Sequence, residues 1–383
     1  MTMRRLLRIA TLGAGALVAG CGGRTLIDLD ERGDASRAEP YLDAEILRDD
    51  GLAPVSAPDA KGALDASGTD AASQVDARDA GRWVEAPTFC APAGALDSLD
   101  VWSDDRGVYV LTSQYLADEV VQFDSGSGWT PVYRAPTRSS LMRLTGFVDG
   151  PLVLYGEATC GIRFLSAGAA QCSAGASFAQ SVHTVRPDLA YAVQNDRVLW
   201  YQGGLWTQLG DPLQPAGQVQ GQSVWSNGDA SVVAATQGRV FVASGTSTFV
   251  AQPKVPPNDF RSAWGFATDD LWVGDSAGNL VHGDGSAWTV AWTDPACGGR
   301  PIRGMWGHRG SLYFYTDSSV GVRDASGVRT IFDEGCNAPD VVTGLWGNSP
   351  SEVFFVVRRG GPVSPACGVA SVFLFDGLAA RPL

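Results

Sequence analysis

The feature that most constrains the fold of this chain is a tryptophan that recurs about every forty residues, just before a short polar turn. The intervals are 39, 42 and 40 residues between Trp225, Trp264, Trp306 and Trp346. A further 123 residues, three steps of 41, separate Trp102 from the first of these. Two intermediate copies, around Leu144 and Val182, keep the apolar-turn-apolar rhythm but lack the tryptophan. A fixed period of this length indicates about seven copies of one structural unit.

A second marker, a glycine-containing turn followed by tryptophan, runs in step with the first. It occurs as FDSGSGWT at Trp129, YQGGLWT at Trp206 and HGDGSAWT at Trp288. The intervals of 77 and 82 residues each equal two repeats. Two markers with one period make the repeat a property of the whole chain after about residue 82.

Each copy contains four short apolar runs separated by Gly, Asp, Ser or Asn. In the clearest copy we predict strands at 260–266, 271–275, 280–283 and 288–292, joined by the turns ATDD, SAGN and DGSA. Asp-Gly turns suit tight hairpins because their residues adopt positive φ readily. No long segment of helical period competes after residue 90, so the fold class is all-β.

Four strands in 41 residues, repeated seven times, resemble a β-propeller of the WD, Kelch and Asp-box kind. The resemblance covers residues 82–383 and implies about seven four-stranded blades, with a right-handed β-helix as the alternative. The WD dipeptide and the paired glycines of Kelch are absent, and FDSGSGW has Gln122 where the Asp-box has Ser. Similar tryptophan-glycine repeats occur in secreted Gram-negative lipoproteins, usually without assigned chemistry.

The N-terminus has the organisation of an export signal. Arg4, Arg5 and Arg8 precede an apolar stretch too short for a permanent membrane span. The following LVAGC resembles the lipobox of bacterial lipoproteins, which implies a signal peptide at 1–20 and lipidation of Cys21, with palmitate among the acyl chains. Gly22 and Gly23 are not the Asp of an inner-membrane retention signal, so we expect a lipid anchor in the outer membrane, with the leaflet open. A plain secretory signal or an uncleaved anchor is the alternative.

Residues 21–81 form a separate segment, rich in Ala and Asp and almost free of aromatic side chains. Low hydrophobicity with excess negative charge cannot offset the entropy of ordering, which predicts a disordered tether. A transient helix in YLDAEILRDDGL is the alternative. A random coil of about sixty residues spans roughly 40 Å, enough to lift a domain above the lipid headgroups.

The overall charge narrows the choice of partner. The chain carries a net charge of −13 and only two lysines, Lys61 and Lys254. Nucleic-acid binding requires clustered Lys and Arg to neutralise phosphates, so we expect no nucleic-acid partner.

The six cysteines besides Cys21 are expected to form three disulfides, as an even set does in an exported protein. The blade register favours the pairs Cys90–Cys367, Cys297–Cys336 and Cys160–Cys172. The first pair would lie where the ring closes, and RWVEAPTFC, residues 82–90, could fasten the last blade there.

The repeat contains no recognisable catalytic, cofactor or metal motif, so we expect no catalytic residues, no cofactor and no metal. The three histidines, His183, His282 and His308, lie at different repeat positions, which argues against a metal set. A pair of turn carboxylates could perform acid-base work, but the structural interpretation is that each caps its own turn. The candidates are Asp104, Asp105, Asp269, Asp270, Asp317 and Glu352.

Arginines and tryptophans are the better candidates for binding. Six arginines could line one face and bind carboxylates, although solvated cations are the simpler interpretation: Arg138, Arg143, Arg261, Arg303, Arg358 and Arg359. The repeated tryptophans are expected to pack between blades; any that face the channel mouth could stack on sugars.

These patterns favour a lipid-anchored, non-enzymatic binding or scaffold protein of the cell envelope, whose partner is a protein or a polysaccharide. The alternative is a carbohydrate-active enzyme, a glycoside hydrolase or lyase that uses the turn carboxylates. A purely structural surface component has the same sequence signature as the binding protein.

Overall fold

A computed structural model describes residues 99–113, 118–124, 127–135, 143–157, 160–166, 169–213, 220–228, 231–244, 248–256, 258–295, 298–359 and 369–383. They belong to a compact unit formed by residues 75–383. Several predicted features lie outside the described residues: the predicted signal peptide with Cys21, the predicted tether, residues 82–90 with Cys90, and Arg138, Cys297 and Cys367. No helix in the described part of the chain is long and apolar enough to span a membrane.

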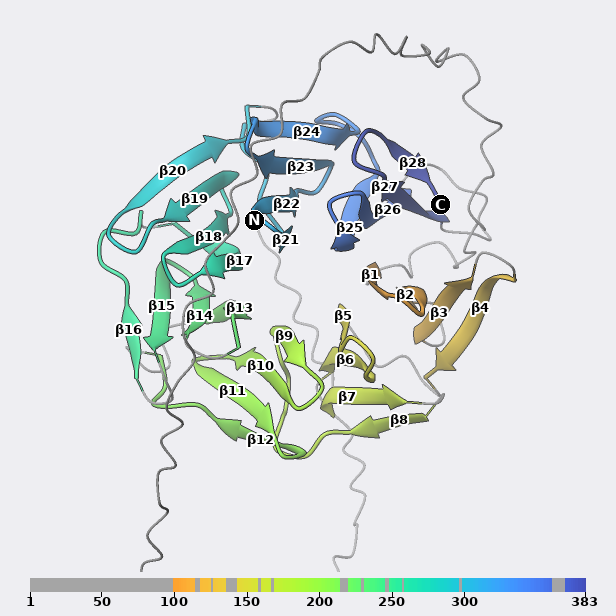
Figure 1. The fold of residues 1–383 in the computed structure, drawn as a ribbon, viewed down its shortest axis with the longest axis horizontal. Helices are drawn as coiled ribbons and strands as arrows, with labels where there is room; N and C mark the ends of the chain where they lie inside the picture. Colours follow the sequence, from red (N-terminus) through yellow and green to blue (C-terminus); the bar gives the residue numbers. More distant parts are fainter. Residues whose placement is uncertain are drawn as a thin grey trace, which may run out of the picture. The chain divides into compact units, whose positions relative to one another are not determined.

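The described residues form seven four-stranded antiparallel sheets arranged as the blades of a ring, which confirms the predicted propeller (Figure 1). Each sheet uses four strands that are consecutive in sequence. Blades 1 to 3 comprise β1 (Leu99–Asp104), β2 (Gly107–Ser113), β3 (Asp118–Asp124) and β4 (Gly128–Arg134); β5 (Arg143–Gly146), β6 (Leu152–Glu157), β7 (Gly161–Ser166) and β8 (Ala169–Cys172); β9 (Ser181–Arg186), β10 (Leu189–Gln194), β11 (Arg197–Gln202) and β12 (Leu205–Gln208).

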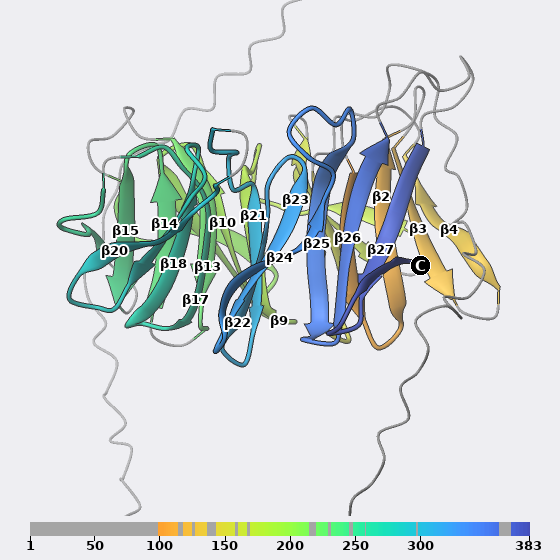
Figure 2. The same ribbon diagram turned by 90° about the horizontal axis from the view of Figure 1, so that it is seen from above.

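Blades 4 to 7 comprise β13 (Gly221–Ser226), β14 (Ser231–Thr236), β15 (Arg239–Ser244) and β16 (Phe249–Ala251); β17 (Phe260–Ala267), β18 (Asp270–Asp275), β19 (Asn279–Gly283) and β20 (Trp288–Thr293); β21 (Gly304–His308), β22 (Ser311–Tyr315), β23 (Ser319–Asp324) and β24 (Gly327–Asp333); β25 (Val341–Ser349), β26 (Glu352–Arg359), β27 (Val369–Phe375) and β28 (Ala380–Pro382). Blade 5 is the copy predicted strand by strand, and its boundaries agree within two residues. The first strand of each blade faces the centre of the ring, and the strands run between its two faces (Figures 1 and 2).

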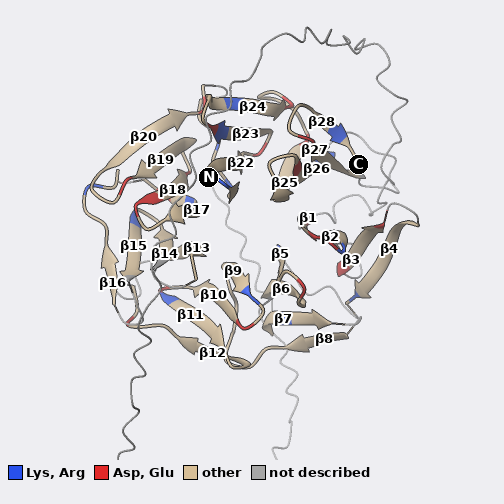
Figure 3. Ribbon diagram, viewed as in Figure 1, with Lys and Arg blue, Asp and Glu red and all other residues tan. Residues whose placement is uncertain are grey.

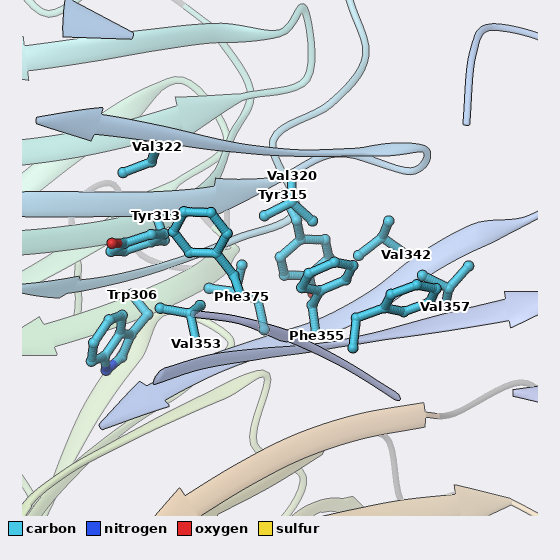
Figure 4. Packing of buried hydrophobic residues seen from close by; sticks show 12 residues of the cluster. Trp306, Tyr313, Tyr315, Val320, Val322, Val342, Val353, Phe355, Val357 and Phe375 are labelled. Atoms are coloured by element: carbon cyan, nitrogen blue, oxygen red, sulfur yellow. The ribbon is translucent and has the colours of Figure 1, made fainter. Parts of the chain in front are cut away.

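The hydrophobic core is divided among the seven junctions between neighbouring blades. Each of seven buried clusters combines residues from two adjacent blades. At the junction of blades 6 and 7, for example, Trp306, Tyr313 and Tyr315 pack against Val353 and Phe355 (Figure 4). Both faces of an inner blade strand are therefore covered, which explains why Tyr313, Phe314 and Tyr315 are all buried although they alternate in direction.

Ring closure uses the same kind of packing as the other junctions. Blade 7 takes all four of its strands from residues 341–382, so its sheet needs no strand from the N-terminal side. Val101, Val108 and Val110 of blade 1 pack against Phe354 and Val356 of blade 7. Since burying one such side chain contributes about 1.5–3 kcal/mol, this packing stabilises the closed ring.

The recurring tryptophan-glycine pair has a steric origin at these junctions. The Trp225 indole lies on Gly265 of the next blade, where an added Cβ would be 2.6 Å from the ring. The Trp306 indole lies in the same way on Gly347, at 2.7 Å. Each glycine follows the tryptophan of its own blade but leaves room for the tryptophan of the blade before. The dipeptide therefore encodes blade-to-blade packing.

The two copies without the tryptophan form the same kind of blade junction with different residues. Thr145 of blade 2 and His183 of blade 3 occupy the tryptophan position. At the junctions just described, a glycine of the next blade makes room for the indole. Here the corresponding residue is Thr184 opposite Thr145 and Ser226 opposite His183. His183 Nε2 lies 3.0 Å from the Ser226 carbonyl oxygen, and the Thr145 and Thr184 hydroxyls are 3.4 Å apart. Polar contacts replace indole packing where the tryptophan is missing.

The predicted Cys160–Cys172 disulfide is present, with 5.5 Å between the two Cα atoms. Cys160 lies just before β7 and Cys172 ends β8, so the bond joins parts of one blade. Cys336, between β24 and β25, is also disulfide-bonded. Its predicted partner and the Cys90–Cys367 pair lie outside the described residues.

Candidate functional site

A cavity of about 670 Å³ lies in the ring where the inner strands begin, and all seven blades contribute to its wall. Each inner strand supplies its first residues, such as Asp100 of β1, His183 of β9 and Thr343 of β25. Its volume is in the range of about 300–1,000 Å³ typical of small-molecule sites.

One repeat position supplies most of the polar wall. Three residues before the tryptophan position, blades 3 to 7 carry Gln180, Gln222, Arg261, Arg303 and Thr343, and all five line the cavity. The tryptophan position holds tryptophan in five of the seven blades because of packing, whereas this neighbouring position varies among Gln, Arg and Thr. The difference indicates that this position is not fixed by the needs of the fold.

Four of the six candidate arginines are brought together in the cavity wall: Arg143, Arg261, Arg303 and Arg358. Arg359 lies outside it and pairs with Glu334 at 3.1 Å and Asp340 at 2.5 Å. Figure 3 shows that charged residues elsewhere on the ring lie mainly at strand ends and turns.

Arg143 reaches across the channel from blade 2. Its Nη1 donates to the Tyr315 hydroxyl of blade 6 and to the Thr343 carbonyl of blade 7, both at 2.9 Å. The same Nη1 is 4.0 Å from the Asp100 carboxylate. The Tyr315 hydroxyl donates in turn to the Thr343 carbonyl at 3.1 Å. Blades distant in sequence are thus tied together at the channel wall.

Asp100 is the buried acid of the site and was not among the sequence candidates. Its carboxylate accepts the N–H groups of Val101 and Leu144, both at 3.0 Å. Ser181 and Ser223, at the same repeat position in blades 3 and 4, accept the equivalent N–H groups of the next blades. Burial raises the pKa of the Asp100 carboxyl to about 6, although the charge of Arg143 opposes the shift.

His183 is the only one of the three histidines that lines the cavity. Burial lowers its pKa to about 4, against the opposing effect of its hydrogen bond to the Ser226 carbonyl. The neutral ring contacts Trp264 edge-on, with 5.6 Å between the centroids. His282 instead stacks on Trp272, and His308 stacks on Trp306. No group of three or more His, Cys, Asp or Glu in the described part of the chain could hold a metal ion.

The candidate turn carboxylates do not converge on one centre. Asp104 caps its own turn by accepting the Arg106 N–H at 2.9 Å, as the structural interpretation expects. Asp270 instead accepts the Trp272 indole N–H at 2.7 Å. Asp317 lines the cavity and pairs with Arg303 through two contacts of 2.9 and 3.1 Å.

The repeated tryptophans divide into two groups. Trp225 and Trp306 are buried between blades, as predicted. Trp264 and Trp346 are only half-buried and form part of the cavity wall. The expectation of core packing therefore holds for the first pair, while the second pair also presents indole surface to the channel.

Comparison with known proteins supports the architecture. No protein-family model matches the sequence, and no curated protein matches it. Among solved structures, virginiamycin B lyase from Staphylococcus aureus is 12% identical with a TM-score of 0.56, covering 74% of this chain and 97% of that one. The WD40 β-propeller domain of Doa1 is 11% identical with a TM-score of 0.53, covering 71% and 92%. The extracellular domain of BT4673 from B. thetaiotaomicron is 12% identical with a TM-score of 0.54, covering 76% and 40%.

The fold is a seven-bladed β-propeller. At these identities the likeness extends to the fold alone, and this propeller's function must be argued from its own cavity.

The repeat pattern did not single out four cavity residues, since none of them belongs to a motif: Asp100, Gln180, Gln222 and Thr343. Gln180, Gln222 and Thr343 all lie three residues before the tryptophan position, so aligning the repeats on that position shows them together as one variable polar position. Asp100 lies one residue later in the repeat, two before the tryptophan position, where blades 3 to 5 have serine.

Proposed function

We propose that this propeller is a non-enzymatic binding protein of the cell envelope, tethered by a lipid on Cys21, that holds a protein or glycan partner at the mouth of its channel. The observation that carries the proposal is the cavity of about 670 Å³, walled by all seven blades, in which a packing position that is mostly tryptophan adjoins a variable polar one. A site shared by every blade is rigid, because its wall residues lie on the inner strands of packed sheets or directly beside strand ends.

The polar groups of the cavity favour binding over turnover. The Asp317 carboxylate is held by Arg303, and the Asp100 carboxylate is held by two backbone N–H groups. A general acid or base needs a proton position facing the substrate, whereas these carboxylates are engaged in the wall.

The alternative is a carbohydrate-active enzyme, and one observation favours it. The pKa of Asp100, about 6, is in the range of a catalytic acid, and Asp100 lines the cavity. Virginiamycin B lyase is an enzyme with a similar fold, so the architecture accommodates catalysis.

Binding and turnover are separated by one screen. The chain from residue 22 onward is mixed with envelope polysaccharides and proteins, and both retention and released products are measured. We expect retention without product. Turnover abolished by Asp100→Asn would instead establish the enzyme.

A bulky substitution places the binding in the cavity. Gln222→Trp narrows the cavity, whereas Gln208→Trp puts the same side chain on the exposed outer strand β12. The first should abolish retention and the second should leave it unchanged. Equal retention by both variants would contradict binding in the channel.

The anchor is tested separately in a Gram-negative host. Labelled palmitate should be incorporated into the full chain, and Cys21→Ser should abolish the label and release the protein from the membrane fraction. Label that survives the substitution would reject the lipoprotein assignment.

A further inference from the structure

We infer that the channel cavity recognises the carboxylate of a hexuronic-acid unit in an acidic glycan. This deepens the proposed function and depends on it. The inference rests on three features of the wall: the cationic side chains, the donors they leave unused, and the aromatic surfaces beside them.

The cavity is cationic although the chain carries a net charge of −13. Four arginines line it, against the two carboxylates of Asp100 and Asp317. Arg261 is paired with Asp259 at the edge of the site. Arginine is thus the main charged residue of the wall, beside the carboxylates of Asp100, Asp259 and Asp317. An anionic ligand is therefore attracted to this cavity against the overall field of the protein.

Arg143 and Arg303 both contact Tyr315, and their charges act on each other. The Arg303 backbone N–H donates to the Tyr315 carbonyl at 2.8 Å, and Arg143 donates to the hydroxyl of the same tyrosine. The charge of Arg143 acts to lower the pKa of Arg303, although the Asp317 carboxylate raises it overall. Like charges held together by a rigid scaffold favour an anion between them.

The guanidinium groups also retain donors for a ligand. Within the described residues, Arg303 uses Nε and Nη2 on Asp317, which leaves Nη1. Arg143 uses Nη1, which leaves Nε and Nη2. The Arg261 Nε and the Thr343 hydroxyl are buried without a hydrogen-bond partner in the described structure. Such unsatisfied groups are costly, and a carboxylate with neighbouring hydroxyls satisfies them.

The rest of the wall fits a sugar better than a peptide end. Trp264 and Trp346 present half-buried indole surfaces, on which the C–H face of a pyranose ring packs. The Gln222 amide N–H₂ group can donate to a ring hydroxyl, whereas the Gln180 amide is already bonded to Asn195 through both its nitrogen and its oxygen. A carboxylate on a sugar ring combines these needs in one unit.

The test uses oligomers of galacturonate, glucuronate and mannuronate, with their methyl esters as matched neutral probes, and the chain from residue 22 onward. Calorimetry should show that at least one acid oligomer binds and that its ester binds at least about tenfold more weakly, since a charged hydrogen bond contributes about 1.5–3 kcal/mol. Equal affinity for acid and ester overturns the inference, as does failure of all three acids to bind.

Matched variants assign the recognition to the arginines. Arg303→Gln and Arg261→Gln introduce the residue that blades 3 and 4 carry at the same repeat position, so the fold should tolerate them. Each should weaken acid binding about tenfold or more without changing the melting temperature. Arg381→Gln, on the outer strand β28, should have no effect. Unchanged binding in both cavity variants overturns the assignment.

Other outcomes separate this inference from the proposed function. A neutral glycan that binds in the cavity, with loss in Gln222→Trp, leaves the binding function standing and removes the uronate. A peptide that binds as the free C-terminal acid but not as the amide also leaves the binding function standing. It replaces the uronate with the C-terminus of a protein partner. Release of shortened oligomers from the acid probe rejects the non-enzymatic function itself.

Discussion

Gly347→Ala is expected to lower the free energy of unfolding by about 2–3 kcal/mol, although it adds only one methyl group. Gly347 lies on β25, and an added Cβ would be 2.7–3.0 Å from three atoms of the Trp306 indole. The indole is buried between blades 6 and 7 and cannot move aside without disturbing that junction. Overpacking of this kind typically costs about 1–3 kcal/mol. A compatible Gly→Ala change would instead stabilise by about 0.4–1 kcal/mol, so the sign is diagnostic.

A double-mutant cycle tests whether the indole is the cause. Trp306→Leu removes the indole and should itself be destabilising through lost packing. In that background Gly347→Ala should cost less than about 0.5 kcal/mol, because the contact no longer exists. Urea unfolding of the four proteins measures the coupling. An equal cost of the alanine in both backgrounds would show that the strain lies in the backbone of β25.

The repeat could be predicted from the sequence because blade packing requires similar residue types at corresponding positions of the blades. The tryptophan position must fill a blade junction, and the glycine after it must leave room for the preceding blade's indole, as at Trp225 and Gly265. Turn residues such as Asp284, which accepts the N–H groups of Ser286 and Ala287, mark the hairpins equally well. These are local requirements, so they appear as local patterns, and the blade boundaries followed from them.

The cavity could not be predicted in the same way, because its contacts join residues that are far apart in the sequence. Arg143 binds Tyr315 and Thr343 across 172 and 200 residues of sequence. Only ring closure brings them together, and no spacing along the chain reports it. The six arginines were a correct class of candidate, but the sequence did not separate Arg303, in the cavity wall, from Arg359, which is paired elsewhere.

The acid of the site was missed for a related reason. Asp100 stands at a position where Ser181 and Ser223 accept the equivalent backbone N–H group of the next blade. A hydroxyl is enough for that bond, so the carboxylate is a local departure from the repeat. It lies between Arg143 and the N–H of Leu144, where its charge is buried. Departures of this kind, at positions that the fold already satisfies, are where function is best sought.

Asp100 and His183 are expected to give the stability of the propeller opposite pH dependences that nearly cancel in the native protein. Asp100 has a pKa of about 6 when folded and 3.8 as its ordinary value, so the folded state holds an extra proton between these values. Its contribution to stability is complete below pH 3.8 and is lost as the pH rises through 6, by about 3 kcal/mol. Arg143, Tyr155 and Tyr315 interact electrostatically with Asp100, and since the pKa of each is raised they stay in one protonation state throughout this window.

His183 acts in the other direction. Its pKa is about 4 when folded and 6.5 ordinarily, so the unfolded chain holds the extra proton. Stability from this group is lost as the pH falls from 6.5 to 4, by about 2–3 kcal/mol, the lower figure allowing for a half-buried ring. His308 shifts in the same direction as His183.

Neutral substitutions separate the two contributions. Asp100→Asn should leave a protein whose free energy of unfolding rises by about 2–3 kcal/mol from pH 4 to pH 6.5, while His183→Gln should leave one that falls by about 3 kcal/mol. The constant cost of each substitution drops out, because only the slope reports the protons exchanged on unfolding. Urea unfolding at four pH values and fixed ionic strength measures the slopes. If Asp100→Asn runs parallel to the native protein, the Asp100 carboxyl has the same pKa in the folded and unfolded states and is not buried at the channel wall as the cavity geometry requires.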